Sequence, residues 1–318
     1  MAICLFALAL VQAAGHCAET TGPKLWDVKT AAQLVAAAAE VGKDGGTIRL
    51  APGVYVITQP IVFKKRTLIN IVGSGWDAGI QMNGKGDAIV FEDCGHCSVR
   101  DLCITGNKDA GSGIIFRGIC GSNTVDFCRI AVFSVSGIRF EGVATSAQST
   151  NTVSRCHLLN NAQDQLYSIH NNDFFILQNQ FGAHGMICKT GARLEHSSAG
   201  SYSLNYHWEN EVAFRLGPGS NFNRIENNRF ENSQREGVII GDPKGWSCVF
   251  NIFIGNTIHT NSEGESGKYA AVTASNAVST TFTSNQVFSW NSTDYKHSSS
   301  LVIGPACKNW IVKDNITD

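Results

Sequence analysis

The chain has 318 residues, of which 43% are hydrophobic and 16% are charged, and its formal net charge at pH 7 is −1. A chain of this length and composition can form one globular domain with a large apolar core. The near-neutral charge argues against nucleic acid or a membrane surface as a partner, because both attract proteins that carry an excess of positive charge.

An apolar stretch over residues 3–14 opens the chain, and small and polar residues follow it. This pattern resembles a secretory signal peptide, and the apolar stretch is too short to span a membrane. We therefore expect a signal peptide over residues 1–18, a single mature domain over residues 19–318, and a secreted or periplasmic location.

One helix is predicted over residues 30–43, an alanine-rich segment with Leu34, Val35, Ala38 and Val41 on one face. The end of a repeating sheet exposes both its edge and its core, so we expect this helix to cap the first repeat. Glycine-containing turns and short apolar runs follow the helix, which indicates strands.

A short motif then repeats to the end of the chain: an apolar residue, two variable residues, a slot residue that is often Asn, one variable residue and another apolar residue. The slot residues stand 21 to 29 positions apart and are Leu102, Cys128, Cys156, Asn179, His207, Asn228, Asn256, Asn285 and Asp314. A period in this range is typical of a solenoid. Each repeat has room for short strands and turns, and no room for a pair of helices.

The slot has a physical reason, because two short strands must meet there at a sharp bend. Asn tolerates the left-handed conformation better than most residues, and its side chain can bond turn backbone that would otherwise be buried without a partner. Stacked at the strand spacing of ~4.8 Å, such residues would form an inward ladder. This ladder resembles that of the pectate lyase and polygalacturonase superfamily. The resemblance implies an all-β, single-stranded right-handed parallel β-helix of roughly ten rungs.

One strand of each repeat follows a loop of variable length, and we term these strands the first sheet. Variable loops on one side of a regular solenoid usually carry the function. The predicted first-sheet strands are residues 89–91, 114–116, 138–140, 166–169, 186–188, 214–216, 238–240, 271–273 and 301–303.

Polar side chains converge on the first sheet, some just before its strands and some at outward positions on them. An acidic sugar chain is the substrate that this mixture of carboxylates and guanidinium groups fits best. The catalytic candidates are His184, Arg215, Asp164 and Tyr167. The substrate-binding candidates are Arg139, Glu211, Arg235 and Glu236.

Residues 164–191, DQLYSIHNNDFFILQNQFGAHGMICKTG, resemble the polygalacturonase family (glycoside hydrolase family 28) from its paired aspartates to its Gly-His-Gly motif. The resemblance implies roles for Asp164, His184 and Arg215. However, Gln165 replaces the second aspartate of the pair, and an inverting hydrolase needs two carboxyl groups. A standard polygalacturonase is therefore disfavoured.

A polysaccharide lyase needs fewer carboxylates, because it must neutralise a uronate, remove a proton and protonate the leaving oxygen. Arg215, Arg139, His184 and Tyr167 could supply these groups, so β-elimination of an acidic polysaccharide is the favoured reaction. Pectate lyases add a calcium site made of aspartates, and the sequence has no comparable cluster. We therefore expect no cofactor, with calcium as the one metal left open.

Two further classes stay open. Outward first-sheet positions include the apolar residues Val90, Ile115, Ile187, Ile239 and Val302, unless the inward and outward phase is shifted by one residue. Such a row could be a subunit contact, as in trimeric inulin fructotransferases, so a homotrimer is one expectation. A non-catalytic polysaccharide-binding or attachment protein is the other.

The chain contains eleven cysteines. Cys94 and Cys120 each lie five residues before an equivalent position of the repeat, Val99 and Val125. They should therefore occupy the same turn on neighbouring rungs, either as a disulfide or as two stacked thiols.

Overall fold

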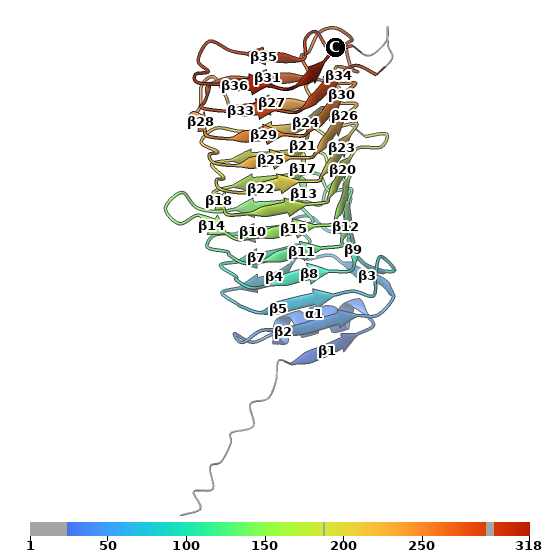
Figure 1. Ribbon diagram of the computed structural model, residues 1–318. Coiled ribbons are helices and arrows are strands. Elements are labelled where there is room, and N and C mark those ends of the chain that lie inside the picture. The colour runs from blue at the N-terminus through green and yellow to red at the C-terminus, as the bar shows by residue number, and fades with distance from the viewer. Residues whose placement is uncertain (1–23, 187, 291–295) are drawn as a thin grey trace, which may run out of the picture.

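The strands of the protein wind into a parallel β-solenoid of about eleven turns, close to the ten rungs expected (Figure 1). The computed structural model describes residues 24–186, 188–290 and 296–318. The expected signal peptide lies outside this described part. No helix within the described residues is long and apolar enough to span a membrane.

Three parallel sheets form the sides of the solenoid, and the chain visits them in the same order in each turn. The twelve-stranded sheet comprises β1 (Leu25–Val28), β2 (Gly46–Leu50), β5 (Ile69–Val72), β8 (Ser98–Arg100), β11 (Thr124–Asp126), β15 (Thr152–Ser154), β19 (Phe175–Leu177), β22 (Ser201–Ser203), β25 (Arg224–Glu226), β29 (Ile252–Ile254), β33 (Thr281–Thr283) and β36 (Ile311–Lys313).

The eleven-stranded sheet comes next in each turn. Its strands are β3 (Gly53–Ile57), β6 (Ala78–Met82), β9 (Cys103–Thr105), β12 (Arg129–Ala131), β16 (His157–Leu159), β20 (Gln180–Gly182), β23 (Tyr206–Trp208), β26 (Arg229–Glu231), β30 (Thr257–His259), β34 (Gln286–Phe288) and β37 (Ile316–Thr317).

The ten-stranded sheet completes each turn and corresponds to the predicted first sheet. Its strands are β4 (Ile61–Lys64), β7 (Ile89–Glu92), β10 (Ile114–Arg117), β13 (Ser136–Glu141), β17 (Asp164–Ile169), β21 (Thr190–Glu195), β24 (Val212–Leu216), β27 (Val238–Ile240), β31 (Val272–Ala274) and β35 (Leu301–Ile303). Two small pairs, β14 (Gln148–Ser149) with β18 (Asn171–Asn172) and β28 (Cys248–Val249) with β32 (Ala277–Val278), lie between sheets.

One predicted first-sheet strand is wrong. Met186 and Cys188 lie outside any strand, and the strand of that turn is β21, Thr190–Glu195. In β21 the side chains of Ala192 and Leu194 enter the core, so Arg193 takes the outward position expected for Ile187. Ile187 itself lies outside the described residues. The prediction failed because a strand with one buried face is marked by alternating apolar and polar residues rather than by an unbroken apolar run.

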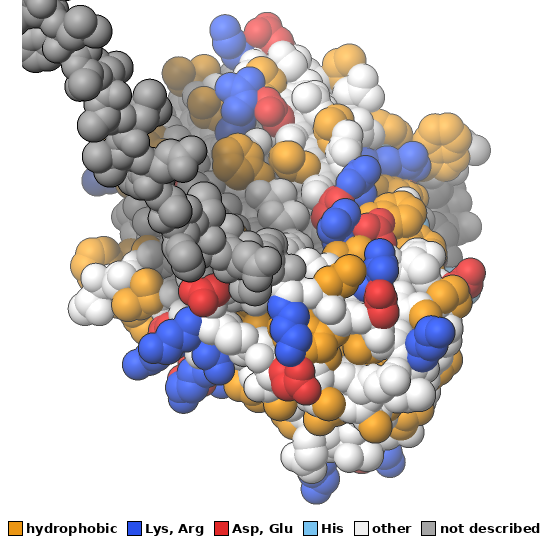
Figure 2. Space-filling model, turned by 90° about the horizontal axis from the view of Figure 1, so that it is seen from below, with side chains coloured by type: hydrophobic (Ala, Val, Ile, Leu, Met, Phe, Trp, Pro, Cys, Tyr) orange, Lys and Arg blue, Asp and Glu red, His pale blue; other side chains and the backbone are white. Residues whose placement is uncertain are grey.

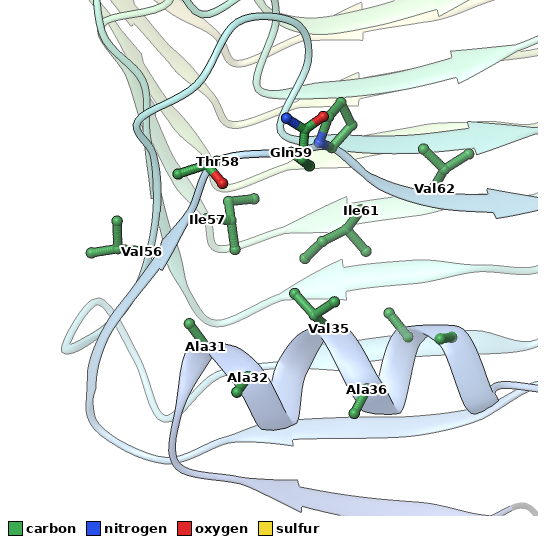
Figure 3. A pocket seen from close by; sticks show the side chains of 13 residues that line it. Ala31, Ala32, Val35, Ala36, Val56, Ile57, Thr58, Gln59, Ile61 and Val62 are labelled. Atoms are coloured by element: carbon green, nitrogen blue, oxygen red, sulfur yellow. The ribbon is translucent and has the colours of Figure 1, made fainter.

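Helix α1 (Ala31–Glu40) lies at the N-terminal end of the solenoid and packs against β1 to β4 (Figure 1). The hydroxyl of Thr30 caps it by accepting the backbone N–H of Gln33 at 3.2 Å. Leu34 is buried, as predicted. Val35 was expected on the same buried face but is 51% exposed, and Ala37 is buried instead. Val35 faces the segment that carries Ile57 and Ile61 across a shallow apolar hollow (Figure 3).

An inward ladder of amide side chains runs along the corner between the twelve- and eleven-stranded sheets. Its members are Asn179, Asn205, Asn228, Asn256, Asn285 and Asn315. Asn228 is typical, because its Nδ2 donates to Asn256 Oδ1 at 3.0 Å and to the carbonyl of Tyr202 at 3.0 Å. Leu102, Cys128 and Cys156 fill the corresponding corner in earlier turns and are fully buried.

Two slot assignments are corrected by the ladder. Asn205, not His207, occupies the slot in its turn, and Asn315, not Asp314, occupies the last one. His207 instead lies in register with the core residues Phe181 and Phe230, where burial lowers its pKa to about 3. The expectation of a left-handed Asn is also wrong, because the positive φ falls on the preceding residue.

That preceding residue is Asn227 (φ 55°), Gly255 (φ 67°) or Ser284 (φ 55°) in successive turns. The ladder Asn therefore contributes only hydrogen bonds to the corner, and the left-handed backbone of the preceding residue turns the chain. The corner is uniform from β8 onward, since two residues separate the strands each time: β25 ends at Glu226 and β26 begins at Arg229. The corner that leads to the ten-stranded sheet varies widely, from Trp208 to Val212 in one turn and from His259 to Val272 in another.

Aromatic stacking supports the earlier turns inside the ten-stranded sheet. Phe63, Phe91, Phe116 and Phe140 form a continuous stack with ring centroids 4.9–5.2 Å apart. Cys94 and Cys120 occupy neighbouring turns, as predicted, and are free buried thiols, with the Cys94 N–H donating to Cys120 Sγ at 3.3 Å. Viewed from the N-terminal end, cationic and anionic side chains are interspersed over the surface (Figure 2).

Candidate functional site

An outward row of side chains crosses the ten-stranded sheet, with one residue from each turn. In register it reads Val62, Val90, Ile115, Arg139, Tyr167, Arg193, Arg215, Ile239, Thr273 and Val302. The flanking residues of these strands belong to the core, so the predicted outward phase is correct. Val90 and Ile115 are nevertheless 6% and 2% exposed, so neither requires a second subunit to cover it.

Tyr167 lies between two guanidinium groups at the centre of this row. The guanidinium carbon of Arg193 is 4.2 Å from the Tyr167 ring centroid, and that of Arg139 is 5.1 Å away on the neighbouring turn. Cations over an aromatic face are attracted by its negative quadrupole. Because strand spacing is ~4.8 Å, residues in register on adjacent turns reach this contact distance without distortion.

Carboxylates on both sides of the row hold these side chains. Arg193 binds Asp164 Oδ2 through Nη2 at 3.0 Å and lies 3.5 Å from Glu195 Oε1 through Nη1. Tyr167 donates its hydroxyl to Glu195 Oε2 at 2.8 Å. Arg139 pairs with Glu141 in the same way, and Arg117 also reaches Glu141, at 3.1 Å.

Arg193 and Glu195 were missed by the sequence analysis, although a signal for them exists. Strand β13 reads Ser-Gly-Ile-Arg-Phe-Glu and strand β21 reads Thr-Gly-Ala-Arg-Leu-Glu. The Gly-x-Arg-x-Glu pattern, two turns apart, places an Arg and a Glu on the same outward face each time. Comparing these two segments directly would have located β21 and both residues.

A hollow of about 300 Å³ lies beside the row, where the strands begin. It is lined by Gln163, Asp164, Lys189, Thr190, Arg193, Glu211, Val212 and Arg215. Three cationic side chains and two carboxylates face it, which gives an excess of one positive charge at neutral pH. Among the described residues, Arg215 makes no ion pair within 4 Å, so its charge is available to a ligand.

Burial shapes the titration of two groups here. Desolvation raises the pKa of Asp164 above its usual value, against the opposing charge and hydrogen bond of Arg193. Asp164 is only 2% exposed, yet it borders the hollow. Desolvation and the nearby charge of Glu195 also raise the pKa of Tyr167, so its hydroxyl stays protonated at neutral pH and can donate a hydrogen bond or a proton.

The structure brings together most of the candidates that were predicted from sequence. Asp164, Glu211 and Arg215 line one hollow, and Tyr167 and Arg139 lie two and three turns from Arg215 along the row. Arg235 links Glu211 to the next turn, since its Nη1 is 3.3 Å from Glu211 Oε1. Its Nε is also 3.3 Å from Glu236 Oε2, but without the angle of a hydrogen bond.

His184 is not part of this group. Its side chain is 90% exposed, and its nearest charged partner is Glu209, 3.9 Å away, which follows β23 of the eleven-stranded sheet. The strand that it was expected to precede begins at Thr190, six positions downstream, so His184 sits near the other end of the loop. The predicted proton-transfer role for His184 at the ten-stranded sheet therefore has no geometric support.

The hollow beside α1, of about 760 Å³, is lined by no charged side chain and so offers no acid–base chemistry (Figure 3). In the described part of the chain, no group of three or more His, Cys, Asp or Glu side chains is arranged to hold a metal ion.

The sequence matches no protein-family model and no curated protein sequence. Solved structures do resemble it. The Dettilon tailspike protein gp208 superposes with a TM-score of 0.69 at 13% identity, covering 90% of this chain and 57% of the tailspike chain. An alginate lyase from Paenibacillus sp. str. FPU-7 gives a TM-score of 0.64 at 15% identity, covering 89% of this chain and 99% of the lyase.

A DFA-IIIase from Arthrobacter chlorophenolicus A6, in complex with GF2, gives a TM-score of 0.64 at 12% identity, covering 92% of this chain and 94% of that one. The chain thus spans just over half of the tailspike and nearly the whole of both enzymes. Identities this low establish the architecture alone. The fold is the right-handed parallel β-helix that the Asn ladder indicated.

Proposed function

We propose that the protein is a carbohydrate-active enzyme that binds an acidic glycan along the ten-stranded sheet and cleaves it at the hollow beside Asp164. The observation that carries the proposal is the outward row itself. Arg139, Arg193 and Arg215 follow one another on this face around Tyr167, and Arg215 has no carboxylate partner among the described residues. A guanidinium group recognises carboxylates in a planar, bidentate manner.

The solenoid face suits a linear polymer, because each turn offers one further contact along the chain. Structural neighbours whose names include an alginate lyase and a DFA-IIIase support a carbohydrate substrate for this chain. We further propose that the protein acts after export, on the basis of its N-terminal sequence.

Hydrolysis is the reaction that this geometry supports best. Asp164 and Glu211 border one hollow, and in register Asp164 is two turns from Val212, the residue after Glu211. At the spacing of parallel strands, two turns separate backbones by ~10 Å. An inverting hydrolase needs its two carboxyl groups about 6.5–9.5 Å apart, so that a water molecule fits between them and the sugar. The carboxyl groups of Asp164 and Glu211 can reach this separation if both side chains extend into the hollow.

The roles follow from the environments of the two carboxyl groups. Asp164, whose pKa is raised by burial, would take up a proton as the pH falls and donate it to the leaving glycosidic oxygen. Glu211, whose side chain is 34% exposed, would accept a proton from the water that attacks the anomeric carbon. Glu211 supplies the second carboxylate that Gln165 could not.

β-Elimination is the second candidate, and Tyr167 is the observation that favours it. Its protonated hydroxyl, held between two guanidinium groups, could protonate a leaving oxygen, while Arg215 neutralises the uronate. Its weakness is the position of His184, which leaves this reaction without the expected base.

The test is incubation of the full chain with a panel of acidic polysaccharides and inulin, following both reducing ends and absorbance near 235 nm. Reducing ends without new absorbance indicate hydrolysis, and an unsaturated product indicates elimination. A cyclic product without reducing ends would indicate fructotransferase chemistry. Binding without any product would instead support an attachment protein.

Three variants separate the two reactions. Asp164→Asn should lower a hydrolytic rate by about 10²–10⁴-fold, the usual cost of losing a proton-transfer group. Tyr167→Phe should do the same to an elimination rate. Arg215→Ala should raise KM in either case. Full activity in all three would place the active site elsewhere on the solenoid.

A further inference from the structure

A second hollow, of about 630 Å³, lies on the outward face of the eleven-stranded sheet. Its walls come from β26, β30 and β34 and from the residues that follow these strands. It shares no lining residue with the hollow beside Asp164. We call it the Trp–Glu hollow, and its main residues are Arg229, Glu231, His259, Glu263, Phe288 and Trp290.

Aromatic side chains form one wall of the Trp–Glu hollow. Trp290 is 68% exposed, so its ring is accessible to a ligand in the hollow. Phe288 stacks on the His259 ring, with centroids 5.1 Å apart and planes 9° from parallel. Flat aromatic faces at the rim of a polar hollow provide the apolar surface on which the C–H face of a sugar ring can be buried.

Glu231 forms the floor of the hollow, and neighbouring side chains already bind its carboxylate. It accepts hydrogen bonds from the hydroxyl of Tyr206, from Arg229 and from His259 Nε2, the last at 2.8 Å. Burial alone would raise the pKa of Glu231, but these donors outweigh it and lower the pKa. Glu231 is therefore an ionised carboxylate whose charge is already compensated.

Glu263 faces the same hollow without such compensation. Among the described residues its one hydrogen-bond partner is Gln234, whose Nε2 lies 3.5 Å from Glu263 Oε2, and no cation lies within 4 Å. Burial, with repulsion from Glu209 and Glu231, raises the pKa of Glu263 to about 7. A cation placed against Glu263 would relieve this repulsion.

We propose that the Trp–Glu hollow is a second glycan-binding site, which takes a sugar unit that carries a protonated amine. The sugar ring lies against Trp290 and Phe288, and its ammonium group binds Glu263. Arg229 is already paired with Glu231, which leaves Glu263 as the carboxylate without a cationic partner among the described residues, so the hollow favours a cationic sugar over a uronate. The two sites therefore select sugars of opposite charge, and this assignment does not rest on the proposed cleavage reaction.

Binding should be linked to a proton. At pH 6, below the pKa of about 7, Glu263 is mostly protonated in the free protein. An ammonium group favours the ionised carboxylate, so binding at pH 6 should release close to one proton per site. A site that recognised only the sugar ring would release none.

The experiment is isothermal titration calorimetry of the full chain at pH 6, in two buffers of different ionisation enthalpy. The probes are a glucosamine tetramer, its fully N-acetylated counterpart and spermidine. The acetylated tetramer keeps the rings and lacks the amine, and spermidine has amines and no ring. We expect the glucosamine tetramer to bind with proton release, and the other two to bind at least about tenfold more weakly.

Variants of the lining residues show which side chains bind the glucosamine tetramer and which one releases the proton. Glu263→Gln should weaken the glucosamine tetramer by about tenfold or more and remove the proton release, and Trp290→Ala should weaken it without changing the proton count. Glu265→Gln is the matched control, since Glu265 is exposed in the same loop and pairs with Lys268 at 2.6 Å. It should bind normally, and thermal melting should show that every variant is folded.

Each other outcome contradicts the proposal in a defined way. If the acetylated tetramer bound equally well, the site would not recognise the ammonium group. If spermidine bound equally well, the site would not recognise the sugar ring. No binding of any probe at millimolar concentration would remove the site. Asp164→Asn should leave binding unchanged, so a failed cleavage assay does not affect this test, and loss of binding in that variant would show that the hollows are not separate.

Discussion

The side chain of Tyr167 is held by residues of both neighbouring turns, Arg139 on one side and Arg193 and Glu195 on the other. Arg193 contacts Asp164, Glu195 and the Tyr167 ring at once. Such a network gives the face a defined shape before any ligand arrives, which reduces the ordering that a substrate must impose. It also makes the charged residues interdependent.

The first prediction concerns this interdependence. Arg193→Met removes the partner of a carboxylate that is only 2% exposed, so it should lower the free energy of unfolding at pH 7 by about 2–3 kcal/mol. Urea denaturation measures the change. Arg224→Met, which breaks the exposed pair with Glu226, is the control and should cost less than about 1 kcal/mol.

A double variant identifies the cause of that loss. Adding Asp164→Asn to Arg193→Met removes the stranded charge, so part of the lost stability should return. Strictly additive losses would mean that the Arg193–Asp164 pair does not stabilise the fold.

The second prediction concerns pH. The pKa of Glu263 is raised to about 7, above its usual 4.5, so the stability it contributes is full below pH 4.5 and is lost as pH rises through 7. Glu263→Gln should therefore raise the melting temperature relative to the natural sequence at pH 8 and change it little at pH 4.5. Thermal melts of both proteins between pH 4.5 and pH 8 measure this difference in melting temperature. An equal difference at both pH values would show that ionisation of Glu263 does not destabilise the fold.

Among the elements, the ladder corner is the most demanding, because each Asn bonds both neighbouring turns. The third prediction is that Asn228→Ala lowers the free energy of unfolding by about 2–5 kcal/mol. It leaves the backbone N–H of Asn205 and the carbonyl of Tyr202 without the partners that Asn228 supplies. Chemical denaturation gives the measurement.

The control for the ladder is Asn83→Ala, because Asn83 is exposed and its side chain hydrogen-bonds only Gln81 among the described residues. We expect a change within about 0.5 kcal/mol there. A comparable loss in both variants would mean that the amide ladder is incidental to stability.

The ladder corner, between the twelve- and eleven-stranded sheets, also explains which elements could be predicted from the sequence. Period and slot residue located nearly every turn, since the ladder allows only a few residue types and no change in corner length. The turn that contains His207 was misplaced because Leu204, three positions before His207, fits the apolar position of the motif by type, whereas its backbone is left-handed (φ 58°) and forms the bend. Strand β21 was missed because the loop before it contains a more hydrophobic run than the strand itself.

The candidate site was only partly predictable for a related reason. Outward positions follow from alternation, so Arg139, Tyr167 and Arg215 could be placed. The position of His184 depended on the length and path of one loop, which no periodic pattern specifies. The Trp–Glu hollow lies on the eleven-stranded sheet, where the variable loops begin, and not on the first sheet to which they lead. It becomes visible only when Glu231, Glu263 and Trp290 are brought together by folding.

For the whole molecule, a net charge of −1 is compatible with two proposed binding sites that prefer sugars of opposite charge. The fourth prediction is that the affinity for an acidic oligosaccharide falls steeply between about 0.05 M and 0.5 M NaCl, because the Debye length shortens over this range. Arg215→Ala should lower both the affinity and its dependence on salt. Fluorescence titration can measure both.

Binding that is insensitive to salt would contradict this electrostatic account. The Trp–Glu hollow offers an internal comparison, since Glu263→Gln should leave the salt dependence of acidic oligosaccharide binding unchanged.

The unequal corners of the solenoid also determine how such a protein can diverge. An extra residue between β25 and β26 would displace an Asn from the ladder or shift β26 out of register with β23 and β30. An extra residue between β30 and β31, where the chain already runs from His259 to Val272, would lengthen only a surface loop. Insertions can therefore accumulate at one edge of the molecule, turn by turn, while the scaffold is inherited unchanged, and a lineage can exchange its specificity loops without refolding its core.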